Sequence, residues 1–457
     1  MENLTVKELV KASKGNLLKG REGDTVNGIV IDSRLAKRGI MFTAIEGENT
    51  DGHKYIKAAY DLGCRTFAVK KEKDIELEAD DVNIIEVEDT VTALGDIARE
   101  YRNRFDIPFV GITGSVGKTT TRDMVYAVLS SENHALKNEK NYNNHLGVPL
   151  TLFNLGKEHE YAVVEMGMSH FGEIEYLAGI AQPDIAVISN VGLSHVENLG
   201  SQEGIFKAKM EITSNFGKGN TLIVNGDDKF LPTLKNKETE YEVVTFGFNE
   251  DNDVYCSNYT MDDESITFKC VIDKEYEITI PTVGKHNIYN AMAAISVGFK
   301  MGLGIETIKK GLANFKATAM RLDIENTGDF TVINDTYNAS PDSMEAALSI
   351  LGRYDKRRIA VLGDMLEMGE HAELGHRRTG KACIENADII ITAGKDSAFI
   401  NMEAEENGFD KSKSFHFEAR DEAIECLGKL LKKGDVVLCK ASRGMKFEKI
   451  VEFIKEK

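Results

Sequence analysis

The chain has 457 residues, a length that at roughly 150 residues per domain predicts about three domains. Hydrophobic residues make up 42% and charged residues 28%, which is typical of a globular protein and argues against disorder. The 56 Lys and Arg against 74 Asp and Glu give a net charge of −18, so we expect no nucleic-acid partner. The six cysteines have no CxxC spacing, which argues against a zinc site and a disulfide framework.

The amino-terminal stretch MENLTVKELVKASKG is polar and amphipathic and contains no apolar run that resembles a signal peptide. No later run approaches the length of a membrane span. We therefore expect a cytoplasmic protein with no membrane partner, and we expect it to be a monomer.

Strand and turn signals divide the first two thirds of the chain into two parts. Residues 1–107 alternate short apolar strands with turns, which predicts a small N-terminal α/β domain. In residues 108–315, several apolar runs end at Gly, Asn or Asp, which is typical of a parallel sheet that is buried on both faces and binds ligands at the carboxyl ends of its strands. These runs are PFVGIT, YAVVEMG, PDIAVISNVG and NTLIVNGDD.

Later segments complete an α/β fold with three domains. The central domain has two further predicted strands, which are antiparallel: EYEVVTFGF and SITFKCVI. A helix is predicted for HNIYNAMAAISVGFKMG, and Asn287 and Asn290 lie off its buried stripe. That stripe consists of Ile288, Met292, Ile295 and Phe299. In residues 316–457, the strands FTVIND, RIAVLGD, DIIITAG and DVVLCK alternate with helix-length stretches and predict a C-terminal Rossmann-like domain, although no GxGxxG opens it.

The run GITGSVGKTTT, residues 111–121, predicts a phosphate loop in a central P-loop-type parallel sheet domain. A glycine-rich turn between a strand and a helix exposes backbone N–H groups that attract phosphate. Lys118 can reach the β- and γ-phosphates of ATP, and the Thr119 hydroxyl can ligate Mg²⁺. The spacing from Gly111 to Lys118 is GxxxxxGK, which is one residue longer than the usual phosphate-loop pattern unless Gly111 is left out of the motif. A glycine turn without a ligand is the alternative. The candidate ATP-binding residues here are Gly114, Ser115, Val116, Gly117, Lys118, Thr119 and Thr120.

Candidate metal partners of this loop lie at the ends of two strands. Glu165 follows YAVV and His195 lies in the loop after DIAVISN. Mg²⁺ prefers oxygen ligands, and a lone histidine is more often structural, so His195 alone stays ambiguous. No NKxD segment that reads guanine is found, which argues against a switch GTPase.

Eight ordered blocks, spread over essentially the whole chain, resemble the Mur ligases. In that family the N-terminal domain grips the UDP end of the substrate, the central domain binds ATP, and the C-terminal domain closes over both. The blocks are DSRLAKRGIMFTAIEGENTDGH, TGSVGKTTT, NEKNYNNHLGVPLTL, VEMGMSHFGEI, ISNVGLSHVENLGSQEGIFKAKMEI, GKHNIYNAMAA, NDTYNASPDSM and VLGDMLEMGEHAELGH.

The resemblance implies catalytic roles for Lys118, Glu165, His195 and Lys209. Lys118 would hold the ATP phosphates, Thr119 and Glu165 would serve one Mg²⁺, and His195 would serve a second. Lys209 matches a lysine that related members carry as a carbamate, which would turn a cation into an oxygen ligand for the metal. An unmodified lysine on a helix surface is the alternative for Lys209.

The resemblance also implies binding residues farther from the loop. An arginine suits phosphate charge, and an amide can both donate to and accept from a base edge. The alternatives are helix-surface polar residues for the two asparagines of the predicted helix, domain-interface polar residues for the closing-domain set, and a turn with a solvated arginine for Ser33 and Arg34. Asn287 and Asn290 would lie on the adenine side, Arg321, Asp335 and Asn338 would contact the nucleotide from the closing domain, Ser33 and Arg34 would meet the uridine diphosphate, and Asn143 and Asn144 would lie by the acyl end of the substrate.

The implied reaction joins D-alanyl-D-alanine to UDP-N-acetylmuramoyl-tripeptide through an acyl phosphate, with ATP and Mg²⁺. The member that adds the third peptide residue normally shows a DNPR segment, where this chain has YNASPDSM. The member that adds the first residue usually opens with a GxGxxG turn, which this chain lacks. Folylpolyglutamate synthase lacks the N-terminal domain with DSR. Another Mur ligase and a non-catalytic ATP-binding module stay as alternatives. The chain departs from the family pattern at Ser340 and Ala441, so no role is assigned to the neighbouring Lys440.

Overall fold

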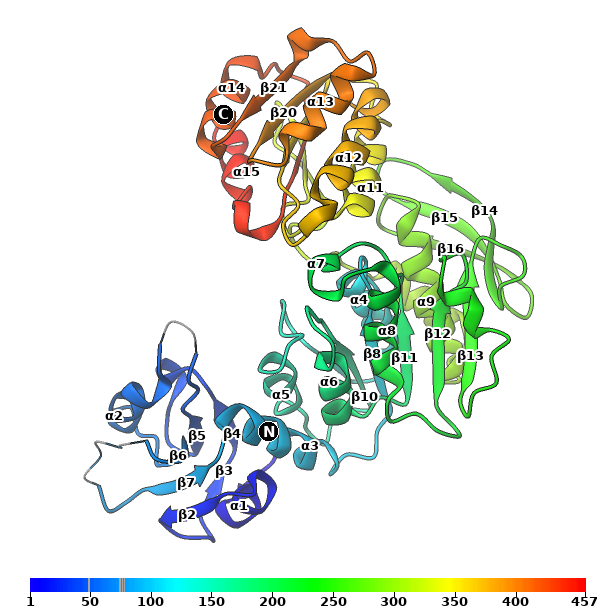
Figure 1. Ribbon diagram of the computed structural model, residues 1–457. Helices are drawn as coiled ribbons and strands as arrows, with labels where there is room; N and C mark the ends of the chain where they lie inside the picture. The colour runs from blue at the N-terminus through cyan, green and yellow to red at the C-terminus, as the bar shows by residue number, and fades with distance from the viewer. Residues whose placement is uncertain (48–49, 74, 76, 78) are drawn as a thin grey trace.

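The computed structural model describes residues 1–47, 50–73, 75, 77 and 79–457. Three large sheets follow one another along the chain and form three bodies in space (Figure 1), and β1 and β3 add a two-stranded antiparallel sheet to the N-terminal body. The N-terminal body, in blue, lies at one end of the molecule beside helices α3, α5 and α6, and the C-terminal body, in orange and red, lies at the other end. This mixed α/β architecture confirms the predicted fold class. The boundaries at residues 107/108 and 315/316 stay a proposal.

The N-terminal sheet has the order β2-β7-β6-β5-β4, and all its pairs are parallel except β2 with β7. Helix α3 connects this sheet to the central body. Its buried residues belong to a hydrophobic core that also contains residues of β10, α5 and α6, so the N-terminal and central bodies share one apolar cluster. The elements are β1 (Leu4–Thr5), α1 (Val6–Ser13), β2 (Asn16–Lys19), β3 (Thr25–Val26), β4 (Gly28–Val30), β5 (Ile40–Thr43), α2 (Ile56–Asp61), β6 (Thr66–Lys70), β7 (Asn83–Val87) and α3 (Thr90–Arg102).

The central sheet has the order β16-β15-β14-β13-β12-β11-β8-β10-β9. All pairs from β9 to β14 in this order are parallel, and β15 pairs antiparallel with both β14 and β16. The expectation for SITFKCVI is therefore confirmed, but EYEVVTFGF was expected to be antiparallel and is not. It forms β13, which runs parallel to β12 because the chain crosses over to it through residues 226–241 instead of a tight hairpin.

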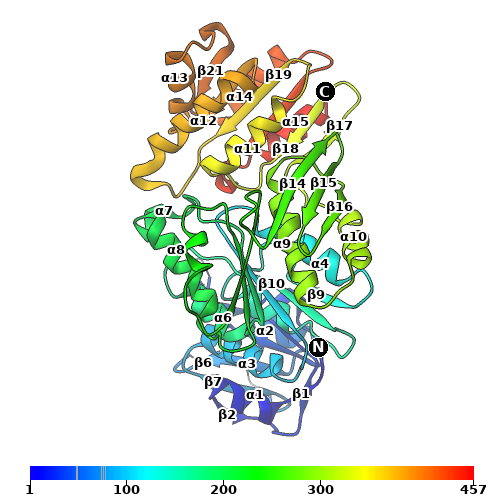
Figure 2. The same cartoon turned by 90° about the vertical axis from the view of Figure 1, so that its right-hand side faces the viewer.

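Helices cover both faces of the central sheet, as its apolar strands require (Figure 2). Helices α4, α9 and α10 pack in one core, and α5, α6 and α8 pack in the other. The carboxyl ends of β8, β10 and β11 thus meet at one edge, where ligands of such sheets bind. The elements are β8 (Phe109–Thr113), α4 (Lys118–Leu129), β9 (Ala135–Lys137), α5 (Gly147–Leu152), β10 (Tyr161–Glu165), α6 (Glu173–Ala181), β11 (Ile185–Ile188), α7 (Val196–Leu199), α8 (Gln202–Met210), β12 (Thr221–Asn225), β13 (Glu242–Gly247), β14 (Val254–Met261), β15 (Ile266–Val271), β16 (Glu275–Ile280), α9 (His286–Lys300) and α10 (Ile305–Ala313).

The C-terminal sheet has the order β17-β18-β22-β19-β20-β21 and is parallel except at β17. Cores lie on both of its faces, which confirms the Rossmann-like expectation. None of the described helices is both long and apolar enough to cross a membrane. The elements are β17 (Asp323–Asn326), β18 (Thr331–Asn334), α11 (Pro341–Leu351), β19 (Arg358–Gly363), α12 (Ala372–Asn386), β20 (Ile389–Ala393), α13 (Ala398–Glu406), β21 (Ser414–Phe417), α14 (Arg420–Leu430), β22 (Val436–Lys440) and α15 (Glu448–Lys455).

Candidate active site

The phosphate loop connects β8 to α4 and requires glycine at two positions. Gly114 has φ +153° and Gly117 has φ +83°, conformations that residues with a side chain rarely adopt. A Cβ on Gly114 would lie 1.9 Å from Ser189 Oγ, and one on Gly117 would lie 2.8 Å from Asn290 Oδ1. The end of β11 and helix α9 therefore press directly against the loop backbone.

The first turn of α4 offers backbone donors that nothing in the described protein satisfies. Ser115 N and Val116 N both donate to Asn190 Oδ1, at 3.1 and 2.9 Å. The N–H groups of the next four residues, 117–120, donate to no acceptor among the described residues, and no side chain caps this helix. Unsatisfied donors at a helix N-terminus, together with the helix dipole, form an anion site.

Lys118 folds back over this turn. Its Nζ donates to Gly114 O at 2.8 Å and to Ser115 O at 3.3 Å. Burial lowers the pKa of Lys118; nearby Glu165 acts in the opposite direction, and nearby Arg321 lowers it further. The ammonium is therefore poorly compensated and gains from an approaching anion.

Glu165, at the end of β10, joins the loop to two other elements. Its side chain accepts from Thr119 Oγ1 at 2.9 Å, from Asn143 Nδ2 at 2.8 Å and from Arg122 Nη1 at 3.3 Å. It is only 1% exposed. The structure brings Thr119 and Glu165 together. Asn143, which was expected by the acyl end of the substrate, donates its amide to Glu165 instead.

Asn287 and Asn290 are buried against the phosphate loop, so the expectation that they face away from the buried side of α9 is wrong. Asn290 Oδ1 accepts from Thr121 Oγ1 at 3.0 Å, and its Nδ2 donates to Asn287 Oδ1 at 2.9 Å. Asn287 Nδ2 donates to Val283 O at 2.7 Å. These side chains hold α9 against α4, and helix α9 is buried around most of its circumference.

Lys209 lies on α8 with only 2% of its surface exposed, which contradicts the alternative of a surface lysine. Its Nζ makes no hydrogen bond or ion pair with any residue in the described part of the chain. Burial lowers the pKa of Lys209 well below the usual value, the nearby Lys118 lowers it further, and Asp228 acts in the opposite direction. Burial without a partner disfavours the charged form of the amine.

His195 precedes α7 and has φ +63°, in the left-handed region. Its Nδ1 lies 2.6 Å from Oε2 of Glu367, a residue of the C-terminal body, in an ion-pair contact that lacks the direction of a hydrogen bond. Ser194 Oγ donates to Ser115 O at 3.4 Å, so the His195 loop packs on the phosphate loop. The histidine therefore lies where the central and C-terminal bodies meet.

The three C-terminal candidates lie on that same side. Arg321 stacks on Tyr337, with its guanidinium carbon 4.0 Å from the ring centroid, and its Nε is buried without an acceptor in the described protein. Lys440 Nζ donates to Asp335 Oδ2 at 2.5 Å and to Asn338 O at 2.9 Å. Asp335 and Asn338 are thus held by a buried lysine to which no role was assigned.

The remaining candidates lie away from the loop. Ser33 and Arg34 belong to a short 3₁₀ helix of the N-terminal body, and Arg34 forms a bidentate contact with Asp32. Asn144 Oδ1 accepts from Gly147 N at 2.9 Å and so supports the start of α5. Asn144 also lines a cavity of about 360 Å³ together with His145, Gly167, Phe171, Gly172, Glu173, Tyr176 and Leu177.

The donor set of the loop fits Mg²⁺ only if phosphate oxygens complete it. In the described residues, no group of three or more His, Cys, Asp or Glu could hold a metal ion. Mg²⁺ commonly uses one or two carboxylates together with substrate phosphates. The buried Glu165 carboxylate and the Thr119 hydroxyl, beside free N–H donors for phosphate, meet that requirement.

The fold and this site define a nucleotide-dependent three-domain enzyme architecture, and known proteins share it. The description "Mur ligase middle domain" matches residues 112–298, "Mur ligase, glutamate ligase domain" matches 320–443, and "Mur ligase family, catalytic domain" matches 25–102. The UDP-N-acetylmuramoyl-tripeptide–D-alanyl-D-alanine ligase of Bacillus subtilis is 38% identical over 454 residues, 98% of this chain and 97% of the relative. The chain belongs to the Mur ligase family.

Solved structures agree over the full length. A crystal structure of MurF from Acinetobacter baumannii has a TM-score of 0.92 at 30% identity and covers 100% of both chains. MurF from Thermotoga maritima, solved in complex with ADP, has a TM-score of 0.82 at 27% identity and covers 94% of this chain and 97% of its own.

Three residues of the site escaped sequence reasoning. Arg122 contacts Glu165, Asn190 binds the loop amides, and Lys440 holds Asp335. Arg122 directly follows the loop motif in a helical position, so only its burial distinguishes it from a solvated arginine. Asn190 could have been found as the polar residue at the end of a buried strand next to β8.

Proposed function

We propose that this protein joins D-alanyl-D-alanine to UDP-N-acetylmuramoyl-tripeptide with cleavage of ATP to ADP, in peptidoglycan precursor synthesis. The observation that carries the proposal is the unsatisfied first turn of α4 beside Lys118, with Thr119 and Glu165 paired next to it. The full-length likeness to ligases of this printed name supports the choice of substrates.

In the first step, the terminal carboxylate of the tripeptide attacks the γ-phosphate of ATP, giving an acyl phosphate and ADP. Two anions must approach each other, so the protein has to offset negative charge. The N–H groups of residues 117–120 and the Lys118 ammonium are the groups placed to do this. Lys118 has only to release the loop carbonyls that it contacts now.

Thr119 and Glu165 would hold one Mg²⁺ beside these groups, His195 would serve a second, and Lys209 as a carbamate would supply an oxygen ligand. When bound, the ion supplies Lewis-acid stabilisation of phosphoryl charge. Lys209 suits carbamate formation because a neutral amine can attack CO₂, releasing one proton and leaving a carboxylate-like oxygen donor. Its burial lowers the pKa of the amine and so favours the neutral form.

In the second step, the amine of D-alanyl-D-alanine attacks the acyl carbon and displaces phosphate. No nucleophile of the enzyme is required, and the task of the protein is to align the two substrates. Arg321, with its unpaired buried Nε, is available for phosphate or nucleotide charge. The side chains of Asn287, Asn290 and Asp335 already have internal partners, and Asn338 accepts from Lys440 through its carbonyl; we propose that these four residues shape the nucleotide pocket. We retain Ser33 and Arg34 for the uridine diphosphate, and Asn143 and Asn144 for the acyl end.

The purified protein should release phosphate from ATP only when UDP-N-acetylmuramoyl-tripeptide and D-alanyl-D-alanine are both present, because the acyl phosphate is consumed by the dipeptide amine. A coupled phosphate assay with each substrate omitted in turn measures this. Equal turnover without the dipeptide would contradict the proposal. Turnover with a single amino acid and the shorter UDP-dipeptide would instead favour the family member that adds the third residue, and no turnover at all would favour a non-catalytic ATP-binding module.

The monomeric state and the cytoplasmic location belong to the same proposal. Light scattering on the purified chain and fractionation of cells test them.

A further inference from the structure

A buried charge cluster links Glu165 to the segment that leads into the C-terminal body. Arg122 donates through Nε and Nη2 to Asp123 Oδ1, at 3.0 and 2.8 Å, and its Nη1 reaches Glu165 Oε2 at 3.3 Å. Lys137 Nζ also donates to Asp123 Oδ1, at 2.8 Å. Two cations thus face two carboxylates, and the side chains of Arg122, Asp123 and Glu165 are each about 2% exposed.

The second oxygen of Asp123 contacts the interdomain segment. Thr318 Oγ1 donates to Asp123 Oδ2 at 2.5 Å. Within the described structure, this is the one hydrogen bond made by residues 316–319. The cluster therefore runs without a break from Thr318 through Asp123 and Arg122 to Glu165 and Thr119.

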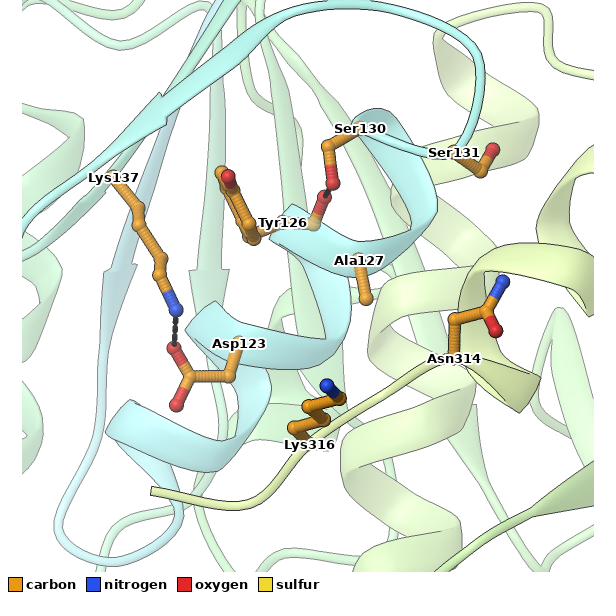
Figure 3. Close-up of a pocket in the computed structure, with 8 residues that line it drawn as sticks. All are labelled: Asp123, Tyr126, Ala127, Ser130, Ser131, Lys137, Asn314 and Lys316. Carbon is orange, nitrogen blue, oxygen red and sulfur yellow. Dashed lines mark hydrogen bonds and ion pairs between the residues drawn. The ribbon is translucent and has the colours of Figure 1, made fainter. Parts of the chain in front are cut away.

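A cavity lies next to the cluster, between α4 and the start of the segment. Figure 3 shows Asp123 and Lys137 joined on one side of the hollow, and Asn314 at the end of α10 and Lys316 of the segment on the other. The cavity has a volume of about 360 Å³. Phe315, just before the segment, is buried in the core that contains Val125 of α4, and beyond it the Thr318–Asp123 bond is what ties residues 316–319 to α4 in the described structure.

A buried ion pair is weak evidence for stability, because desolvation of two charges offsets most of their attraction. Burial alone would raise the pKa of Asp123, but Arg122, Lys137 and Thr318 together lower it, so Asp123 stays an anion that fixes the guanidinium. Partners that orient a metal-binding carboxylate act on metal affinity, typically by about 10–100-fold.

We propose that Arg122, Asp123 and Thr318 are positioning residues that hold the Glu165 carboxylate toward the Thr119 hydroxyl and couple its orientation to the interdomain segment. This inference rests on the proposed role of Glu165 in binding Mg²⁺. Loss of the Asp123 charge frees the guanidinium to turn fully onto Glu165 and compete with the ion. Loss of the Thr318 hydroxyl releases the segment without disturbing either charge.

The test measures ADP binding by calorimetry, with and without Mg²⁺, to the full chain and the variants D123N, T318V and T318S. We expect the strengthening of ADP binding by Mg²⁺ to fall about 10-fold or more in D123N and by a smaller factor in T318V, with metal-free ADP affinity unchanged. T318S keeps the hydroxyl and should match the wild type. T307V is the matched control, because it removes a similar bond outside the cluster, from Thr307 Oγ1 to Glu132 at 3.1 Å, in the turn that follows α4.

The outcomes separate this inference from the proposed function. If the wild type shows no Mg²⁺-dependent ADP binding and no two-substrate turnover, the proposed function itself is wrong. If the wild type shows both and folded D123N and T318V keep its Mg²⁺ dependence, the positioning role alone is wrong. If D123N does not fold, the comparison of T318V with T318S tests the positioning role, because both variants keep the buried charges.

Discussion

Replacing Lys118 with alanine should lower kcat by about 10²–10³-fold, the usual cost of removing one preorganised group that stabilises transition-state charge. The ammonium lies over the first turn of α4 and is poorly compensated by its surroundings, so its attraction for an approaching phosphate is strong. Steady-state phosphate release with both substrates saturating measures the effect.

The control for this variant is Lys218→Ala, which removes an exposed lysine of the same body. Both variants should melt within a few degrees of the wild type. Near-normal turnover of a folded Lys118→Ala protein would remove Lys118 from the phosphate site.

Replacing Lys209 with methionine should lower kcat by about 10²-fold or more, because an oxygen ligand of the metal ion is worth several kcal/mol of transition-state stabilisation. Lys207 lies on the same helix but is exposed, so Lys207→Met is the matched control and should retain full activity. Equal activities of the two variants would contradict the metal role of Lys209.

The same variant should be at least as stable as the wild type near neutral pH. The pKa of Lys209 is far lower in the folded chain than in the unfolded one, so unfolding takes up a proton and is favoured as pH falls below the usual lysine value. Methionine removes this penalty. The advantage of the variant should shrink as pH rises toward about 10, where the unfolded lysine also loses its proton. Melting curves in CO₂-free buffer measure the difference.

Much of the fold could be predicted because the signals are local. The apolar runs that end in Gly, Asn or Asp became β8, β10, β11 and β12, and the loop motif lies between β8 and α4, where its spacing placed it. The direction in which β13 pairs was predicted wrongly because the sequence EYEVVTFGF does not indicate which strand is its neighbour. The direction of pairing depends on the course of the connecting chain.

The side-chain contacts of the site were harder to predict. Asn290 binds Thr121 across 169 positions of sequence, and Asn143 reaches Glu165 across 22. Whether an amide points to a ligand or to its own protein depends on such long-range packing, which periodicity does not encode. Arg122 shows the same limit, since its burial follows from its contacts with Asp123 and Glu165.

The central claim is that a carboxylate of the substrate, and not water, takes the γ-phosphate of ATP at this loop. The most direct test supplies UDP-N-acetylmuramoyl-tripeptide labelled with ¹⁸O in its terminal carboxylate, together with ATP and D-alanyl-D-alanine, and analyses the released phosphate by mass spectrometry. An acyl phosphate carries one carboxylate oxygen into the phosphate, so each phosphate formed from doubly labelled carboxylate should contain one ¹⁸O. Phosphate with its new oxygen drawn from water would contradict the mechanism.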